Sequence, residues 1–157
     1  MVSNLKEYLK DLSKDCRLVP LGKEEKYKNT GRIWINPKRP INDDWRNDTY
    51  NLEEVCKIKK TGIGIVQGVT GNGILCLDFD GANALDNFQE YLGIGLEDLP
   101  PTIAWKSGRP SRHQRAFIVP ESEWTRISHH DSIPEVEIRW TGQSVIAGQH
   151  RIDPDDF

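Results

Sequence analysis

The stretch GIGIVQGVTGNGILCLDFDG, residues 62–81, decides the fold that the sequence predicts. Its two apolar runs, GIGIV and ILCLDFD, have the length and composition of strands. Between them, Gly71-Asn72-Gly73 suits the positive backbone φ of a hairpin turn. Because successive side chains on a strand point to opposite faces, Asp78 and Asp80 are predicted to project together from the end of the second strand.

Two interpretations of this acidic pair are open. Carboxylate oxygens on one rigid strand are good ligands for a hard divalent cation such as Mg²⁺. Aspartate and glycine also favour turns, so Asp78-Phe79-Asp80-Gly81 could simply end a buried strand. The choice between a metal site and a turn depends on which other residues lie beside the pair.

Composition narrows the class of protein. With 157 residues, 36% of them hydrophobic, the chain is long enough for one domain with a core. No apolar run approaches the roughly 20 residues that span a bilayer, and the three cysteines form no CxxC pair, so we expect no membrane contact, disulfide or zinc site. We expect the protein to be located in a reducing cytoplasm. A net charge of −3 argues against nonspecific coating of nucleic acid but allows a local basic groove.

The remaining chain alternates short strands and helices. Periodicity and caps predict helices over 52–60 and 82–92, the second with Leu85, Phe88 and Leu92 inward. Further short strands are predicted at 17–20, 102–107, 115–119, 135–140 and 144–147. Residues 21–50 are polar and rich in turn formers, which predicts a long loop. This order favours an α+β domain with a mostly antiparallel sheet.

Two further islands could carry chemistry beside the aspartates. The loop SGRPSRHQR, residues 107–115, gathers three arginines and a histidine among small residues, a composition that suits phosphate binding through guanidinium and backbone N–H groups. Taken alone, it is more simply a solvated basic loop. In EVEIRW, alternation places Glu137 and Arg139 on one strand face. Acidic and basic clusters together suit a nucleoside triphosphate and its metal.

The order of GIGIVQG…ILCLDFDG, SGRPSRHQRAF, EVEIRW and QSVIAGQH resembles the primase-polymerase domain of the archaeo-eukaryotic primase superfamily. It is most similar to the version at the N-terminus of bacterial, phage and plasmid replication proteins that also carry a helicase. Arg17-Leu18-Val19-Pro20 and Lys38-Arg39-Pro40 with Trp45 add to the likeness, which covers nearly the whole chain. The resemblance implies an RRM-like α+β core with a flanking α/β subdomain.

The resemblance also implies site residues. Asp78 and Asp80 match the family's acidic pair, and Glu137 matches the acidic residue that completes its metal site. These three are the expected catalytic residues and the expected ligands of two Mg²⁺ or Mn²⁺ ions. The expected nucleotide-binding residues are Ser111, Arg112, His113, Gln114, Arg115 and Arg139.

One position is open between two residues. Ser111-Arg112-His113 matches the family's serine-x-histidine pattern, whose histidine contacts nucleotide phosphate. That histidine commonly lies three residues before an aromatic residue, and here Gln114 lies three before Phe117. Since a one-residue shift moves a strand side chain to the other face, either His113 or Gln114 is expected at the phosphate.

The resulting hypothesis is a single primase-polymerase domain over residues 1–157, the N-terminal part of a longer replication protein. It would transfer nucleotides from (d)NTPs onto a 3′-hydroxyl on a single-stranded DNA template, with a fused or associated helicase as partner. The alternative is a degenerate module that binds nucleotide or single-stranded DNA for that helicase without catalysis. A metal-dependent nuclease is a third possibility, with His113 as the candidate base.

Overall fold

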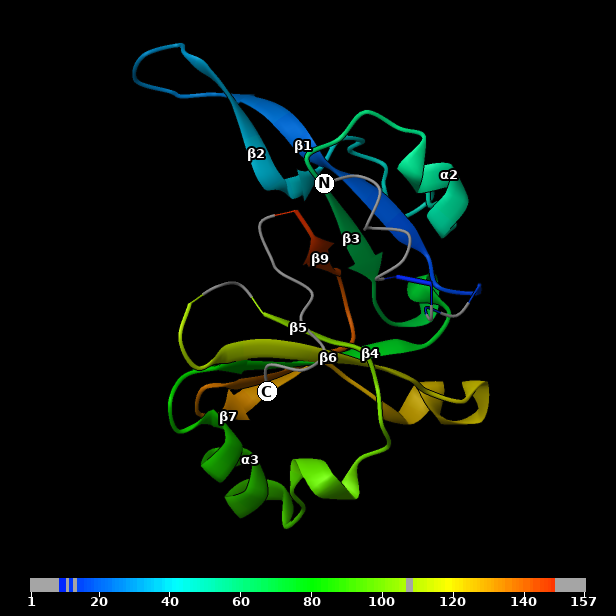
Figure 1. The fold of residues 1–157 in the computed structure, drawn as a ribbon, viewed down its shortest axis with the longest axis vertical. Helices are drawn as coiled ribbons and strands as arrows, with labels where there is room; N and C mark the ends of the chain where they lie inside the picture. Colours follow the sequence, from blue (N-terminus) through cyan, green and yellow to red (C-terminus); the bar gives the residue numbers. More distant parts are fainter. Residues whose placement is uncertain (1–8, 11, 13, 107–108, 149–157) are drawn as a thin grey trace.

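Two antiparallel sheets form the body of the molecule (Figure 1). The computed structural model describes residues 9, 10, 12, 14–106 and 109–148. The first sheet has the order β2-β1-β3-β9 and the second the order β5-β6-β4-β8-β7. The strands are β1 Leu18–Lys26, β2 Ile33–Pro40, β3 Gly62–Val66, β4 Ile74–Asp80, β5 Ala104–Lys106, β6 Arg112–Ile118, β7 His130–Ile133, β8 Val136–Arg139 and β9 Gln143–Ala147. The predicted α+β class is confirmed.

In the described residues two short helices accompany the sheets, with 3-10 segments at Val69–Gly71, Leu96–Asp98 and Glu121–Arg126. Helix α2, Leu52–Cys56, begins at Asn51, which forms a capping box with Glu54, but it ends four residues before the predicted Lys60. Helix α3, Ala84–Leu92, ends at Gly93 in the left-handed conformation, as predicted. No helix in the described part of the chain is long and apolar enough to cross a membrane.

The chain crosses between the sheets at two places. After β3 it passes through the turn at Val69–Gly71 into β4, and after β8 it passes through Thr141 and Gly142 into β9. The predicted hairpin of the two central strands is therefore wrong, because β3 pairs with β1 and β9 while β4 pairs with β6 and β8. Asn72 and Gly73 do have positive φ, but they turn the chain from one sheet to the other.

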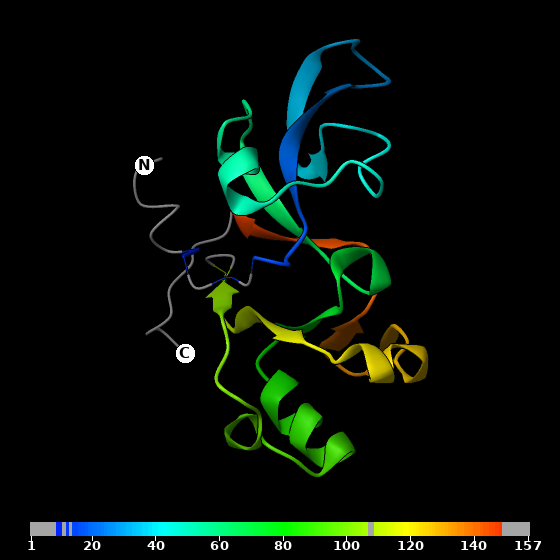
Figure 2. The ribbon, with the colours of Figure 1, turned by 90° about the vertical axis from the view of Figure 1, so that its right-hand side faces the viewer.

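Apolar side chains fill both sides of the five-stranded sheet. Between the sheets, Ile74 and Cys76 of β4 pack with Ile63 and Ile65 of β3. On the other side, Phe79 packs against Phe88 of α3, which covers this face in Figure 2. The prediction for α3 was only partly right, since Phe88 is buried while Leu85 and Leu92 are exposed. The helix is therefore held through one narrow stripe.

The loop predicted over 21–50 is wrong for its first half. Strand β1 continues to Lys26 and pairs with β2 from Ile33, so the two form a hairpin. Its turn is closed by bonds from the Tyr27 N–H to the Arg32 carbonyl and from the Gly31 N–H to the Tyr27 carbonyl. Gly31 has a φ of +67°, which only glycine adopts easily. The rest of the protein covers neither face of this part of the hairpin, so its strands are polar. Their polarity is the reason that the sequence predicted a loop.

Candidate active site between the two sheets

The register of the five-stranded sheet places the predicted acidic residues side by side. Asp78 of β4 lies directly opposite Glu137 of β8, and directly opposed residues in an antiparallel pair project to the same face. Asp80 follows two residues later and shares that face. Backbone bonds from the Asp80 N–H to Glu135 and from the Gly81 N–H to Ser111 fix the end of β4 to both neighbouring strands. The three carboxylates therefore occupy one rigid edge, as predicted.

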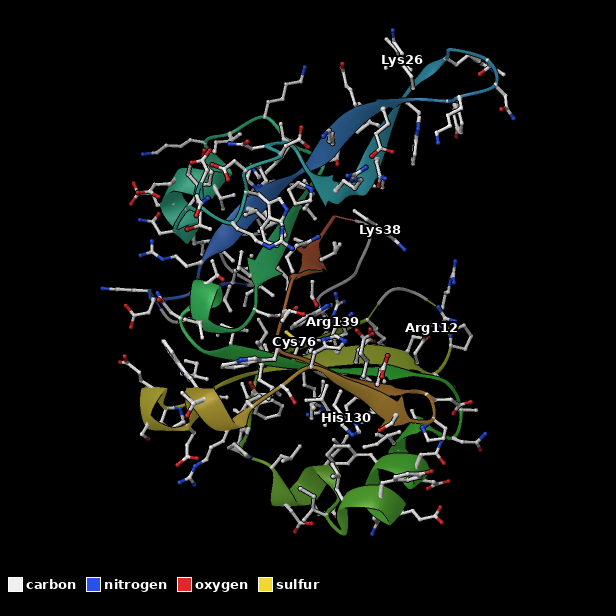
Figure 3. All side chains as sticks on the ribbon, turned by 180° about the vertical axis from the view of Figure 1, so that it is seen from behind. Lys26, Lys38, Cys76, Arg112, His130 and Arg139 are labelled. Atoms are coloured by element: carbon white, nitrogen blue, oxygen red, sulfur yellow. The ribbon has the colours of Figure 1, made fainter. Side chains whose placement is uncertain are left out.

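The acidic face opens into a cleft of about 640 Å³ between the two sheets. Asp78 and Asp80 form part of its wall, with Arg112 and Gln114 from β6 and Arg139 from β8. The opposite wall comes from the first sheet: Lys38 of β2 with Gln143, Ser144 and Val145 of β9. Figure 3 shows Arg112 and Arg139 on the side of the second sheet that faces Lys38.

The predicted nucleotide-binding residues divide between the two faces of β6. Gln114 lies opposite Asp78, and Arg112 lies opposite Asp80, so both project toward the cleft. His113 lies opposite Phe79, and its ring stacks on that buried ring with 4.7 Å between centroids. Although His113 borders the cleft, its ring is on the α3 side. Arg115 lies opposite Leu77 and has the same orientation as His113.

Burial sets the electrostatics of this edge. Burial raises the pKa of Asp78 to about 6, with Glu137 and Asp80 adding to the rise and Arg139 opposing it. For His113, burial and the neighbouring Arg115 and Lys106 lower the pKa to about 4, so the ring is neutral at pH 7. A neutral ring packed on Phe79 is suited to packing rather than to holding a phosphate.

The carboxylates are partly neutralised by protein cations. Arg112 forms an ion pair with Asp80. Glu137 accepts from His129 Nε2 at 2.9 Å and lies 3.6 Å from Arg139 Nε. Within the described ranges, no three His, Cys, Asp or Glu side chains form a group that could hold a metal ion. The oxygen donors and their shared face fit a hard divalent cation, but Asp80 and Glu137 would have to leave their present partners to join Asp78 around it.

Several cleft residues were missed by the sequence analysis. Trp105 of β5 lies opposite Gln114 and is fully buried at the cleft wall. Gln143 donates from Nε2 to the Lys38 carbonyl at 3.0 Å, which ties β9 to β2 within the wall formed by the first sheet. His129, which the sequence analysis did not single out, is exposed and contacts Glu137. A glutamine and a serine that begin an otherwise apolar strand, at 143 and 144, were the available signal.

The comparisons with known proteins agree with this arrangement at the level of family. A family model described as bifunctional DNA primase/polymerase, N-terminal, matches residues 12–156. No curated protein and no solved structure matches the chain. The match spans both sheets and every residue of the cleft.

Proposed function

Because the chain belongs to the bifunctional DNA primase/polymerase N-terminal family, we propose that its cleft carries out metal-dependent nucleotidyl transfer from a (d)NTP onto a 3′-hydroxyl paired with a single-stranded template. The observation that carries this proposal is that acidic and basic side chains meet on one wall of the cleft. Asp78, Asp80 and Glu137 form an acidic edge there, and Arg112, Arg139 and Gln114 lie beside it on the same face of the sheet. A triphosphate with its cations needs both kinds of surface within one cleft.

Each residue has a proposed task. Asp78 and Asp80, joined by Glu137, would hold divalent Mg²⁺ or Mn²⁺. Bound there, the cations would neutralise the triphosphate and favour attack by the 3′-hydroxyl. Arg112, freed from Asp80, and Arg139 would bind phosphate oxygens with their guanidinium groups. Gln114, which lies opposite Asp78, would contact the same phosphates. It would take the role of the family's phosphate-contacting histidine, which His113 matches in the sequence pattern.

A second candidate is binding without catalysis. Two observations favour it: the carboxylates are not gathered into a metal-binding group in the described residues, and Asp80 and Glu137 already have an arginine partner each, Arg112 and Arg139. In this case the cleft would hold a nucleotide or a single strand through its basic wall alone. Metal would bind weakly, and nucleic-acid binding would survive loss of the aspartates.

Primer extension separates the two candidates. A labelled primer on a single-stranded template would be incubated with dNTPs or NTPs and with Mg²⁺ or Mn²⁺. We expect metal-dependent extension that falls by at least about 100-fold in Asp78→Asn/Asp80→Asn, because metal-ion stabilisation of the transition state is worth several kcal/mol.

The matched control is Asp86→Asn, which removes an exposed carboxylate from α3 on the other side of the sheet. It should extend primers like the wild type. If no variant, the wild type included, extends a primer while the folded protein binds single-stranded DNA, the noncatalytic candidate replaces the polymerase.

A further inference from the structure

The β1–β2 hairpin extends beyond the body of the protein. Beyond Leu21 no described residue up to Pro40 belongs to a hydrophobic cluster, and in Figures 1 and 2 the tip of β1 and β2 projects past β3 and β9 and away from the second sheet. Its length therefore adds little to the core. An arm that stabilises the fold so little is available for contact with another molecule.

One face of this arm carries a stacked aromatic pair, of which Tyr27 is exposed and Trp34 is half-buried. Tyr27 stacks on Trp34 with 5.4 Å between ring centroids and 21° between planes. Glu25 lies opposite Trp34, and the bond from the Tyr27 N–H to the Arg32 carbonyl continues this pairing, so Tyr27 and Arg32 share the face of Trp34. Tyr27 is 52% exposed. A pair already stacked against each other offers a ring face to a further planar group at little cost in side-chain entropy.

The arm is also basic in an acidic protein. Residues 22–40 contain six lysines and arginines and two glutamates, whereas the whole chain has a net charge of −3. Lys23 pairs with Asp43, and Arg39 pairs with Glu25. In the described part of the chain, Lys26, Lys28, Arg32 and Lys38 form no ion pair. Arg32 shares the face of the aromatic pair, whereas Lys26 lies opposite Ile33 and projects from the other face. Unpaired cations beside a partly exposed aromatic pair are suited to a polyanion with stackable bases.

The same strand leads from the aromatic pair to the cleft. Trp34 and Lys38 both belong to β2, and Lys38 lines the cleft opposite the carboxylates. In Figure 3, Lys38 lies between Lys26 on the hairpin and Arg139 and Arg112 at the cleft. Strand β2 therefore connects the aromatic pair on the arm to the candidate active site.

We propose that the hairpin tip is a binding site for single-stranded DNA, with a base stacked on the Tyr27–Trp34 pair and backbone phosphates held by Lys28 and Arg32. The proposal rests on the proposed function in one respect: the bound strand would run past Lys38 toward the cleft. It assigns the arm to the template rather than to the incoming nucleotide. It does not require catalysis.

Fluorescence anisotropy of a labelled oligo-dT, without nucleotide, tests the two components separately. Tyr27→Ala/Trp34→Ala should weaken binding about tenfold, because one base stack is lost, and should leave the salt dependence unchanged. Lys28→Gln/Arg32→Gln should lower the slope of log K against log salt by about 1.4, at about 0.7 per phosphate contact. Both side chains are exposed, so the fold should tolerate their loss.

Matched controls come from elsewhere on the surface. Tyr91 of α3 is 58% exposed, so Tyr91→Ala removes a tyrosine of similar exposure. Lys59→Gln removes an exposed lysine away from the arm. Both should bind oligo-dT like the wild type. Oligo-rU and a base-free polyphosphate would show whether the site distinguishes DNA from RNA and whether bases are needed.

The outcomes are distinguishable from those of the primer-extension test. Asp78→Asn/Asp80→Asn should keep hairpin-dependent DNA binding whether or not the wild type is a polymerase. If the aromatic and cationic hairpin variants bind oligo-dT like the wild type, the proposal fails, even if extension is normal. Equal binding of the base-free polyphosphate would overturn the stacking component.

Discussion

On the side toward α3, strand β4 contributes Leu77 and Phe79 to a closed apolar cluster, whereas on the opposite side the same strand contributes Asp78 and Asp80 to an open polar cleft. Four consecutive residues thus alternate between holding the sheet to its helix and forming the candidate active site. The same alternation divides β6, where His113 stacks on Phe79 and Gln114 faces Asp78. In this sheet, one residue of a strand packs in the apolar cluster and the next residue faces the candidate active site.

The largest expected effect on stability lies on the closed side. Phe79→Ala should lower the free energy of unfolding by about 3–5 kcal/mol, because the ring is fully buried between Phe88 and His113 and leaves a cavity. Urea unfolding followed by circular dichroism measures this loss. Ile118→Ala, at an exposed position of β6, should change it by less than about 0.5 kcal/mol. Similar losses for both variants would contradict the division between the faces.

Replacing the neighbouring Asp78 should have the opposite effect on the free energy of unfolding and should stabilise the fold at high pH. Its folded-state pKa is raised to about 6 by burial and by Glu137 and Asp80, so the protonated form stabilises the fold. That contribution is complete below the ordinary aspartate pKa and is lost as the pH rises through about 6. Asp78→Asn should therefore match the wild type near pH 4 and be more stable by roughly 1–2 kcal/mol at pH 8, with solvent screening taken into account.

Unfolding curves across this pH range, with and without Mg²⁺, would sharpen the comparison. A cation bound at Asp78 should stabilise the wild type at pH 8 and leave Asp78→Asn unchanged. If the stability difference between the wild type and Asp78→Asn stays constant from pH 4 to pH 8, the pKa of Asp78 is not raised in the folded protein.

Much of this division was readable in the sequence, and the reasons for the rest are physical. Strand periodicity placed Asp78 and Asp80 on one face, because alternation is local, whereas Glu137 was assigned to their site by the family resemblance. The choice between His113 and Gln114 depends on which of them lies opposite Asp78, and that register is set by two strands far apart in the chain. Gln143 escaped notice, and Lys38 was named only as part of the resemblance, because only the packing of one sheet on the other brings them to the cleft. The hairpin escaped because its strands are polar and solvated.

The pair His113 and Gln114 gives a more sensitive test of the same division. Gln114→Ala should weaken nucleotide binding about three- to tenfold, the worth of one net hydrogen bond. His113→Phe keeps a ring on Phe79 and should leave nucleotide binding unchanged. Titration with a fluorescent nucleotide in Mn²⁺ measures both. Loss of binding in His113→Phe, with Gln114→Ala unaffected, would show that the histidine turns into the cleft when nucleotide binds.

His113→Phe has a pH signature of its own. The folded-state pKa of His113 is lowered to about 4, so the neutral ring contributes stability above the ordinary histidine pKa, and this is lost as the pH falls toward 4. The variant should therefore gain stability relative to the wild type between pH 6.5 and pH 4, where the wild type must take up a proton on unfolding. Thermal unfolding at several pH values measures the gain, and a pH-independent difference would contradict a buried neutral ring.

The smallest expected effect concerns the ion pair of Arg112 and Asp80 at the open end of β4. Both side chains are more than a third exposed, so Arg112→Gln should change the free energy of unfolding by less than about 1 kcal/mol. The same change should weaken triphosphate binding, since a guanidinium that pairs with a carboxylate in the free protein is the group available to a phosphate in the complex. Calorimetry with a nucleoside triphosphate and with the matching nucleoside separates the two roles: Arg112→Gln should reduce affinity for the first and spare the second. Equal loss of affinity for both ligands would mean that Arg112 supports the structure, as Phe79 does, and does not act in the cleft with Asp78.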